Sequence, residues 1–424
     1  MAHVLVLTLV FPPDGVSTAV IMGELSADIR RAGHDVTVVT TVPHYNRDLE
    51  AESRQPLSRL WGPLLYRSEF QGLRVLHVGM PRKSGRVLSR LLAWTRFHVV
   101  SLIAAALLVR RVDVILAPSP PLTIGICAWL LGCMYRAPFV YNVQELYPDI
   151  AIALGMIKNR RIISVLLALE RFVYARARMV TVIGEGMRRR ILAKAVPPEN
   201  VRLIPNFVDV DYMLPLPKDN AFSREHGLDR SFVVTYAGNM GPAQGLDTIL
   251  DAAALLAGEP SLLFLLVGEG SQHARLKAAA EERRLANVLV LGHQPYDLVP
   301  HIYAASDLCV VPLAGQAGAD AIPSKVYRIM ACERPVLACA DADSDLGELV
   351  RHAGCGLVVA PGSATGLADA VRDAVRNPAA CAGMGRAGRA HVLAHYSRAA
   401  VSAQYECLIR EVTAGAPQRM DVQG

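Results

Sequence analysis

The sequence lacks several features that would place it in a familiar class at once. Its eight cysteines form no Cys-x-x-Cys pair, and most lie in apolar segments, which is typical of buried free thiols in a reducing cytoplasm. The net charge of +6 is small for 424 residues, and the two signs are interspersed, so a nucleic-acid binder is not indicated. No internal repeat or low-complexity stretch is present, and the apolar start "MAHVLVLTLV" has no basic segment of a secretory signal.

Hydrophobic runs long enough to span a membrane are also missing. The apolar run Val99–Val109 reaches only about half of the roughly 20 residues that a span needs. Trp94, Phe97 and several arginines surround it, so the segment predicts either a helix on an anionic membrane surface or an ordinary buried helix. We therefore expect a cytoplasmic protein, with peripheral contact to the inner face of the cell membrane as one alternative. The arginines are Arg86, Arg90, Arg96, Arg110 and Arg111.

What the sequence does contain is a regular alternation of short apolar strands with amphipathic helices. Such alternation predicts open parallel sheets with right-handed crossovers. It breaks at 206–220, where Pro, Asp and Asn interrupt both periodicities, and then restarts. We expect an α/β fold of two doubly wound, Rossmann-like domains that face a central cleft, with ligands at the carboxyl ends of the strands. The expected parts are a first domain at 1–205, a linker at 206–220, a second domain at 221–395, and a C-terminal helix at 396–414 that packs back on the first domain.

The segment "DAIPSKVYRIMACERPVL" combines a carboxylate, a helix start and a cation. Pro323 suits a first helical turn, and Ser324 can cap the helix. Lys325 then lies at the wrong end of the helix dipole, which costs a few tenths of a kcal/mol. With an anion bound at the helix start, the interaction of Lys325 with its surroundings would become favourable. The segment therefore predicts a phosphate site, with a plain solvated lysine as the alternative.

A second segment, "YAGNMGPAQGLDTIL", follows a predicted strand with a glycine-rich loop. Gly238 and Gly241 permit close approach of a ligand to the backbone, and Asn239 and Gln244 can donate hydrogen bonds from their amides. A tight turn explains the glycines almost as well.

These two segments, with "PHYN", "YNVQELYPD" and "LIPNFVD" in this order, resemble the family 4 retaining glycosyltransferases. The resemblance covers nearly the whole chain and is closest to the bacterial exopolysaccharide and O-antigen branch, of the colanic-acid and fucosamine transferase type. It implies the GT-B fold, a nucleotide-sugar donor in the second domain and an acceptor in the first. It also implies catalysis in the cleft, with no metal and no cofactor beyond the nucleotide-sugar substrate.

The resemblance also implies site residues. This family usually has an E-x7-E motif here, with its second Glu two residues before "MA" in the helical segment; Asp320 stands for the first Glu, which contacts the donor sugar, and Arg328 for the second, which typically holds the ribose. Asn239 and Gln244 stand where many relatives have the Arg and Lys that hold the diphosphate, which leaves Lys325 as the expected cation. The expected donor and phosphate-binding residues are Gly238, Asn239, Gly241, Gln244, Ser324 and Lys325; the catalytic ones Asp320, Glu145 and His44; the acceptor-side ones Gly15, Tyr45 and Asn46.

The expected reaction is transfer of a sugar, with retention, from a nucleoside diphosphate sugar to a lipid-linked saccharide in bacterial surface polysaccharide synthesis. A UDP-sugar is the favoured donor. No Ser/His/Asp or Cys/His nucleophile pattern is recognisable, which suits a mechanism in which the leaving phosphate helps to deprotonate the acceptor. Two alternatives stay open: a nucleotide-sugar 2-epimerase, and a non-catalytic, membrane-bound partner in a polysaccharide assembly complex.

Overall fold

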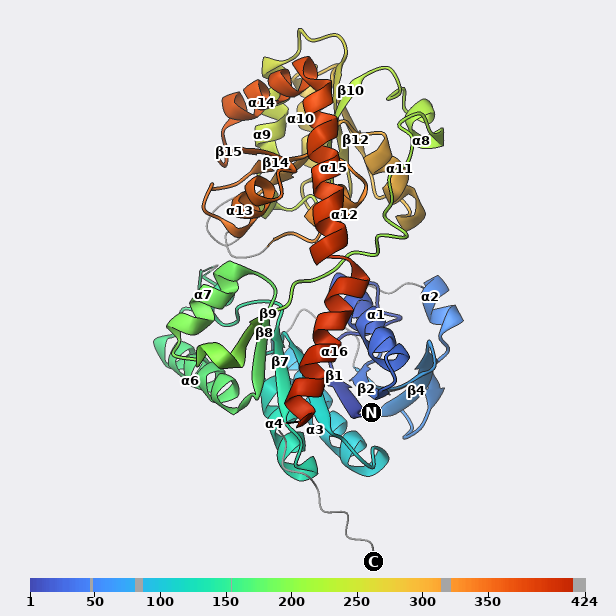
Figure 1. Ribbon diagram of the computed structural model, residues 1–424, viewed down its shortest axis with the longest axis vertical. Helices are drawn as coiled ribbons and strands as arrows, with labels where there is room; N and C mark the ends of the chain where they lie inside the picture. Colours follow the sequence, from blue (N-terminus) through green and yellow to red (C-terminus); the bar gives the residue numbers. More distant parts are fainter. Residues whose placement is uncertain (46–48, 81–86, 154, 314–321, 415–424) are drawn as a thin grey trace, which may run out of the picture. The chain divides into compact units, whose positions relative to one another are not determined.

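The computed structural model describes residues 1–45, 49–80, 87–153, 155–313 and 322–414 (Figure 1). The chain divides into two compact units, which we describe separately. Unit 1 comprises Met1–Ile183, Met187–Ile204 and the residues from Ser402 on; unit 2 comprises Gly184–Gly186 and Pro205–Val401.

Unit 1 is built on one sheet. In the described residues its order from edge to edge is β3 (Ser58–Arg59), β4 (Leu65–Phe70), β5 (Leu73–Val78), β2 (Asp35–Thr41), β1 (His3–Leu7), β6 (Val114–Ser119), β7 (Phe139–Val143), β8 (Met179–Val182) and β9 (Val201–Leu203). All neighbouring strands are parallel except at β3 and β4, which pair antiparallel. The strand order reverses between β1 and β6, so their carboxyl ends border a switch point, where such sheets bind ligands.

Helices cover both faces of this sheet. They are α1 (Ser17–Arg31), α2 (Leu49–Arg54), α3 (Val87–Leu108), α4 (Ile124–Tyr135), α5 (Asp149–Ala153), α6 (Arg160–Arg176), α7 (Glu185–Ala193), the 3-10 turn η1 (Pro198–Asn200) and α16 (Arg398–Ala414). Helix α16 packs on unit 1: Tyr405 is buried, and Ser402 donates a hydrogen bond to Asp28 of α1 at 2.7 Å (Figure 1).

Helix α3, for which the sequence left a membrane-surface helix and a buried helix as alternatives, has both buried and exposed side chains. Phe97 is fully buried, whereas Arg96 is half-buried and donates a hydrogen bond to the carbonyl of Pro63 at 2.6 Å. Other apolar side chains of α3 are exposed instead: Leu92, Val99, Ile103 and Leu107. Among the described helices, none combines the length and the hydropathy that a membrane crossing requires.

Unit 2 is built on a second, fully parallel sheet. Its order in the described residues is β12 (Val288–Leu291), β11 (Leu262–Val267), β10 (Phe232–Ala237), β13 (Leu308–Pro312), β14 (Val336–Cys339) and β15 (Gly356–Val359). The order reverses between β10 and β13, which creates a second switch point. Along β13, Leu308 and Val310 join one apolar cluster, whereas Cys309 and Val311 join another on the opposite face. This alternation shows that helices cover both faces.

The helices of unit 2 divide between those two faces. They are α8 (Ala221–Glu225), α9 (Asp247–Leu255), α10 (His273–Glu282), α11 (Val299–Ala304), α12 (Lys325–Ala331), α13 (Asp345–His352), α14 (Ala364–Arg376) and α15 (Pro378–His395), with 3-10 turns η2 (Pro242–Gln244) and η3 (Tyr296–Leu298). Helices α9, α10 and α14 line one cluster, and α12 and α13 line the other.

The expected fold class, two doubly wound Rossmann-like sheets, is confirmed by these two topologies. The segment 206–220 was expected to be a linker, and in the structure it packs within unit 2. Val208 and Met213 are buried in its core, and Arg389 of α15 donates hydrogen bonds to the carbonyls of Met213 and Val210.

Candidate active site

The switch point of unit 2 brings together the two segments that the sequence singled out. Strands β10 and β13 are paired through Val234–Leu308 and Thr235–Cys309, so their carboxyl ends are neighbours. The loop after β10 begins at Gly238, and helix α12 follows β13 with Lys325 as its first residue. The glycine-rich loop and the cation therefore lie at one edge of the sheet, as predicted from the position of each after its strand.

Lys325 is held over an aromatic ring. Its Nζ lies 4.1 Å from the ring centroid of Tyr236, a cation–π contact. The buried Tyr236 is itself fixed, because its hydroxyl donates a 2.6 Å hydrogen bond to the carbonyl of Asn239. The ammonium is thus placed by a side chain from β10, which sequence reasoning missed.

Gly238 leaves the space that the ammonium occupies. A Cβ at this position would lie 2.8 Å from the Nζ of Lys325, and the φ of +141° is one that residues with a side chain rarely adopt. Gly268, after β11, approaches even more closely: a Cβ there would lie 1.9 Å from the carbonyl oxygen of Gly238. These two glycines therefore set the shape of the loop around Lys325.

The electrostatic environment of Lys325 disfavours its charge. Desolvation, with a smaller contribution from nearby Arg328, lowers the pKa of the ammonium to about 8. No carboxylate pairs with Lys325 in the part of the chain that the structure describes. A bound anion would relieve both effects, which is the electrostatic signature of an anion site.

The other predicted donor residues belong to the loop after β10 and to the start of α12. The loop after β10 is fixed to the loop after β11, since the N–H of Met240 donates to the carbonyl of Glu269 at 2.8 Å. Asn239 is exposed and Gln244 is half-buried in η2, and neither side-chain amide has a hydrogen-bond partner among the described residues. Both amides can therefore donate to a ligand. Gly241 precedes η2 with an ordinary φ of −98°, so its backbone does not require glycine.

Ser324 differs from the sequence prediction. We expected a helix cap, but its backbone is already helical, with φ −57° and ψ −22°, and its side chain makes no capping hydrogen bond. A capping residue needs an extended conformation to reach back to the helix N–H groups. Its hydroxyl is half-buried at the start of α12 instead. Asp320 and Asn46 lie outside the described residues.

In unit 1, a carboxylate that was not predicted organises the acceptor-side residues. Asp14, in the loop after β1, accepts hydrogen bonds from the backbone N–H groups of His44 at 3.0 Å and Tyr45 at 2.9 Å. Its side chain is buried, whereas the adjacent Gly15 is exposed. The loops after β1 and β2 are thereby joined, and the position of Asp14 directly after "FPP" was the available signal.

The hydrogen bonds of His44 define its tautomer. Its Nδ1 lies 3.0 Å from the carbonyl oxygen of Val42 and 3.0 Å from the hydroxyl of Thr41, which itself donates to the carbonyl of Leu9. A carbonyl only accepts, so Nδ1 carries the proton in the neutral ring and Nε2 carries the lone pair. His44 can therefore accept a proton at Nε2.

Glu145 lies at the carboxyl end of β7, on a different part of the same edge. It is exposed, yet partial desolvation raises the pKa of its carboxyl. Strands β1 and β6 separate β2 from β7, so three strand spacings, about 14 Å, lie between the ends that carry His44 and Glu145. The two residues therefore do not form a hydrogen-bonded pair.

A buried polar chain supports the residue before Glu145. The amide of Gln144 donates to Asn142 at 2.7 Å. The amide of Asn142 donates in turn to Thr181 at 3.0 Å and to the hydroxyl of Tyr405 at 2.9 Å. Tyr405 comes from α16, 263 residues further along the chain, so sequence spacing gave no indication of this contact.

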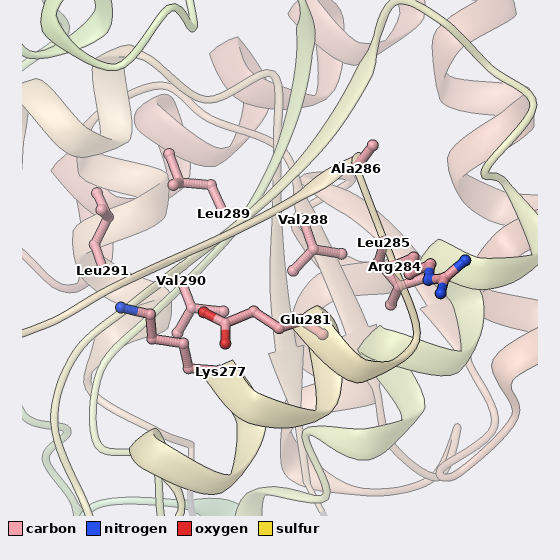
Figure 2. A pocket seen from close by; sticks show the side chains of 10 residues that line it. Lys277, Glu281, Arg284, Leu285, Ala286, Val288, Leu289, Val290 and Leu291 are labelled. Carbon is pink, nitrogen blue, oxygen red and sulfur yellow. The ribbon is translucent and has the colours of Figure 1, made fainter.

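Away from the switch points, the structure shows a pocket that contains none of the predicted site residues. A pocket of about 570 Å³ lies between α10 and the edge strand β12, lined by Val288, Leu289 and Leu291 with Lys277 and Glu281 (Figure 2). It is two strands away from the β10–β13 switch point and holds none of the predicted residues. Among the described side chains, no three His, Cys, Asp or Glu residues gather closely enough to hold a metal ion.

Two family models match this chain. "Glycosyl transferase 4-like domain" matches residues 15–206, and "Glycosyl transferases group 1" matches residues 218–391. Two doubly wound sheets with a cationic, glycine-lined switch point define, together with these matches, a glycosyltransferase of GT-B fold. The chain belongs to the family 4 glycosyltransferases, as its motifs predicted.

The relatives are consistent with this assignment. The chain is 27% identical over 385 residues to WcaI of Escherichia coli (strain K12), named as a colanic acid biosynthesis glycosyl transferase; the match covers 88% of this chain and 92% of WcaI. Sucrose-phosphate synthase from Thermosynechococcus elongatus has a TM-score of 0.73 at 19% identity, covering 97% of this chain and 99% of that one. HepE of Anabaena in complex with UDP has a TM-score of 0.73 at 16% identity, covering 96% and 100%. At these identities the structural likeness shows the fold alone.

Proposed function

We propose that this glycosyltransferase moves a sugar, with retention, from a nucleoside diphosphate sugar to a lipid-linked saccharide in bacterial surface polysaccharide synthesis. A UDP-sugar is the favoured donor. The observation that carries the proposal is the Lys325 ammonium, which lies over Tyr236 beside Gly238 without a carboxylate partner among the described residues. The name of WcaI and the UDP bound to HepE support the process and the nucleotide.

The chemical task is to stabilise the leaving diphosphate. The bond between the anomeric carbon and the diphosphate oxygen breaks, the acceptor oxygen bonds to the same face of that carbon, and the acceptor proton passes to the leaving phosphate. Lys325 and the amides of Asn239 and Gln244 donate to the charge that develops on the diphosphate. One preorganised donor of this kind contributes on the order of 3 kcal/mol to the transition state.

We assign the remaining residues by the family motifs that they match. Asp320 contacts hydroxyls of the donor sugar, and Glu145 orients the reacting groups. On the acceptor side, Gly15, Tyr45 and Asn46 bind the saccharide, and His44, with its lone pair on Nε2, is the alternative proton acceptor. The buried Asp14 supports this role, since it holds the backbone of His44 and Tyr45 in place.

A lipid-linked acceptor requires access to a membrane surface. Ile103 and Leu107 of α3 are exposed, and with Val99 they recur every four residues, which places them on one helix face. Arg110 and Arg111 are exposed directly after this helix. An apolar face beside cations suits the surface of an anionic bilayer.

The proposal is tested with purified protein, a panel of nucleoside diphosphate sugars and undecaprenyl-linked acceptors. We expect release of a nucleoside diphosphate and a glycolipid heavier by one sugar, whose new linkage keeps the anomeric configuration of the donor by NMR. An isomerised nucleotide sugar of unchanged mass would replace the proposal with the 2-epimerase. Release of no nucleoside diphosphate from any donor would favour the non-catalytic partner.

A further inference from the structure

Helix α12 carries two cationic side chains on one face. Lys325 and Arg328 are three residues apart, a spacing that makes them neighbours on a helix surface. Each lies over the ring of a tyrosine from another element. The Nζ of Lys325 is 4.1 Å from the ring centroid of Tyr236, and the guanidinium carbon of Arg328 is 5.6 Å from that of Tyr296.

The ring beneath Arg328 is itself fixed. Tyr296, in η3 after β12, stacks on Tyr212 with ring centroids 5.1 Å apart and an interplanar angle of 3°. The hydroxyl of Tyr212 donates a 3.1 Å hydrogen bond to the carbonyl of Tyr296. The guanidinium is therefore held on a rigid aromatic platform rather than left to move freely in water.

Neither cation has a carboxylate partner within the described ranges of the chain. Many basic residues elsewhere in unit 2 are paired: Arg275 with Asp247 at 2.7 Å, and Arg372 with Asp369 at 2.6 Å. Lys325 and Arg328 instead repel each other, since Arg328 is the charge that disfavours the Lys325 ammonium. Two neighbouring cations without a counter-charge would gain from an anionic ligand that touches both.

The neighbouring loop supplies no charge of its own. Asn239 and Gln244 offer neutral amides at the same edge of the sheet, so both positive charges come from α12. A guanidinium has five N–H donors and no acceptor, so Arg328 cannot accept hydrogen bonds from ribose hydroxyls. Its planar fork instead matches two oxygens of one phosphate.

We propose that Lys325 and Arg328 form a two-cation clamp for the diphosphate of the donor, in which Arg328 holds a phosphate rather than the ribose. The clamp lies at the donor site and rests on the proposed function in taking its ligand to be a nucleoside diphosphate. It makes the diphosphate, more than the nucleoside, the part of the donor that this site recognises.

The clamp is tested by calorimetry with UDP, UMP, uridine and inorganic pyrophosphate. We expect Arg328→Gln to weaken UDP and pyrophosphate binding about 10-fold or more, and to leave any uridine binding unchanged. Arg328→Lys, which keeps the charge without the fork, should lie in between. Arg372→Gln removes a paired cation on α14 and should bind all four ligands as the original chain does. Circular dichroism of each variant checks that it is folded.

The outcomes separate the clamp from the proposed function. If folded Arg328→Gln binds UDP and pyrophosphate like the original protein, or loses uridine and UDP binding equally, the clamp is overturned. If the original protein binds pyrophosphate but no nucleotide, and Arg328→Gln loses pyrophosphate, the clamp stands while the proposed function fails. If the original protein binds neither pyrophosphate nor UDP, GDP or ADP, both fail.

Discussion

The carboxyl edges of the two sheets differ in whether their polar side chains are paired within the protein. In unit 2, Lys325 and Arg328 are held by tyrosine rings and have no carboxylate partner in the described residues. In unit 1, polar groups bind one another: Asp14 holds the backbone of His44 and Tyr45, and a buried chain joins Gln144 to Tyr405.

The difference suggests different ligands. An edge that keeps charge uncompensated gains most from a ligand that brings the opposite charge, because a desolvated ion is unfavourable until it is paired. An edge where Asp14, Asn142 and Gln144 are bonded within the protein presents a fixed shape at these residues, which suits neutral hydroxyl groups. The contrast therefore agrees with a diphosphate donor at unit 2 and a saccharide acceptor at unit 1.

The largest effect is expected from filling the space beside Lys325. Gly238→Ala places a Cβ 2.8 Å from the Nζ and forces a side chain onto a φ of +141°. We expect kcat/KM for transfer to fall by about 100-fold or more, because a misplaced charge loses most of its effect. The matched control is Gly258→Ala, since a Cβ there meets nothing within 4 Å. Equal kinetics for the two variants would contradict the assignment of this loop.

Removing the charge of Lys325 should have opposite effects on UDP binding and on the stability of the unliganded protein. Lys325→Met should weaken UDP binding about 100-fold in calorimetry and leave uridine binding unchanged. The same variant should raise the free energy of unfolding of the unliganded protein by about 1–2 kcal/mol in urea titrations at pH 7, since a disfavoured charge is removed.

The pH dependence of that stability gain has a definite sign. The folded pKa of Lys325 is lowered from 10.5 to about 8, so the unfolded state binds the proton more tightly. The penalty is fully present below pH 8 and disappears as the pH rises toward 10.5. The advantage of Lys325→Met should therefore shrink over this interval, and an advantage that is constant with pH would argue against a desolvated ammonium.

The sequence predicted the sheets well because their strands are short apolar runs bounded by turn residues. It did not predict β3 and β4, whose side chains at the sheet edge are mostly polar. Gly72 was a usable signal, because the turn that joins β4 to β5 has positive φ at Gln71 (48°) and Gly72 (79°), and glycine adopts such values readily.

The site was predicted only where the signal is local. Lys325 could be found because it stands beside Pro and Ser at a helix start. Its partner Tyr236 lies 89 positions earlier and reaches it only through the pairing of β10 with β13, a tertiary contact that spacing does not encode. The burial of Phe97 could not be predicted for a related reason: an aromatic residue in an apolar helix has the same pattern whether it faces the core or the surface.

A smaller effect is expected from the buried chain in unit 1. Tyr405→Phe removes the hydroxyl that accepts from Asn142 at 2.9 Å and leaves a buried amide N–H without that partner. We expect a loss of about 1–2 kcal/mol in the free energy of unfolding and a several-fold rise in KM for the acceptor. UDP affinity should stay unchanged, because Tyr405 belongs to unit 1. Tyr66→Phe, on strand β4 next to the edge strand β3, is the control, and a KM change of equal size in both variants would refute the role of the buried polar chain.

The smallest effect is expected at the surface of α3. Ile103 is 46% exposed and Leu107 is 70% exposed, and replacing both by Glu adds two negative charges to an apolar face. The variant loses part of its apolar contact and gains repulsion from an anionic surface, so co-sedimentation with phosphatidylglycerol vesicles should fall several-fold. Leu255→Glu changes a residue of α9 in unit 2 that is 54% exposed, and this variant should sediment like the original protein. Because the α3 variant adds two charges and the control adds one, a loss for Leu255→Glu about half as large as that for the α3 variant would mean that net charge alone governs attachment. Undiminished sedimentation of the α3 variant would contradict membrane contact through α3.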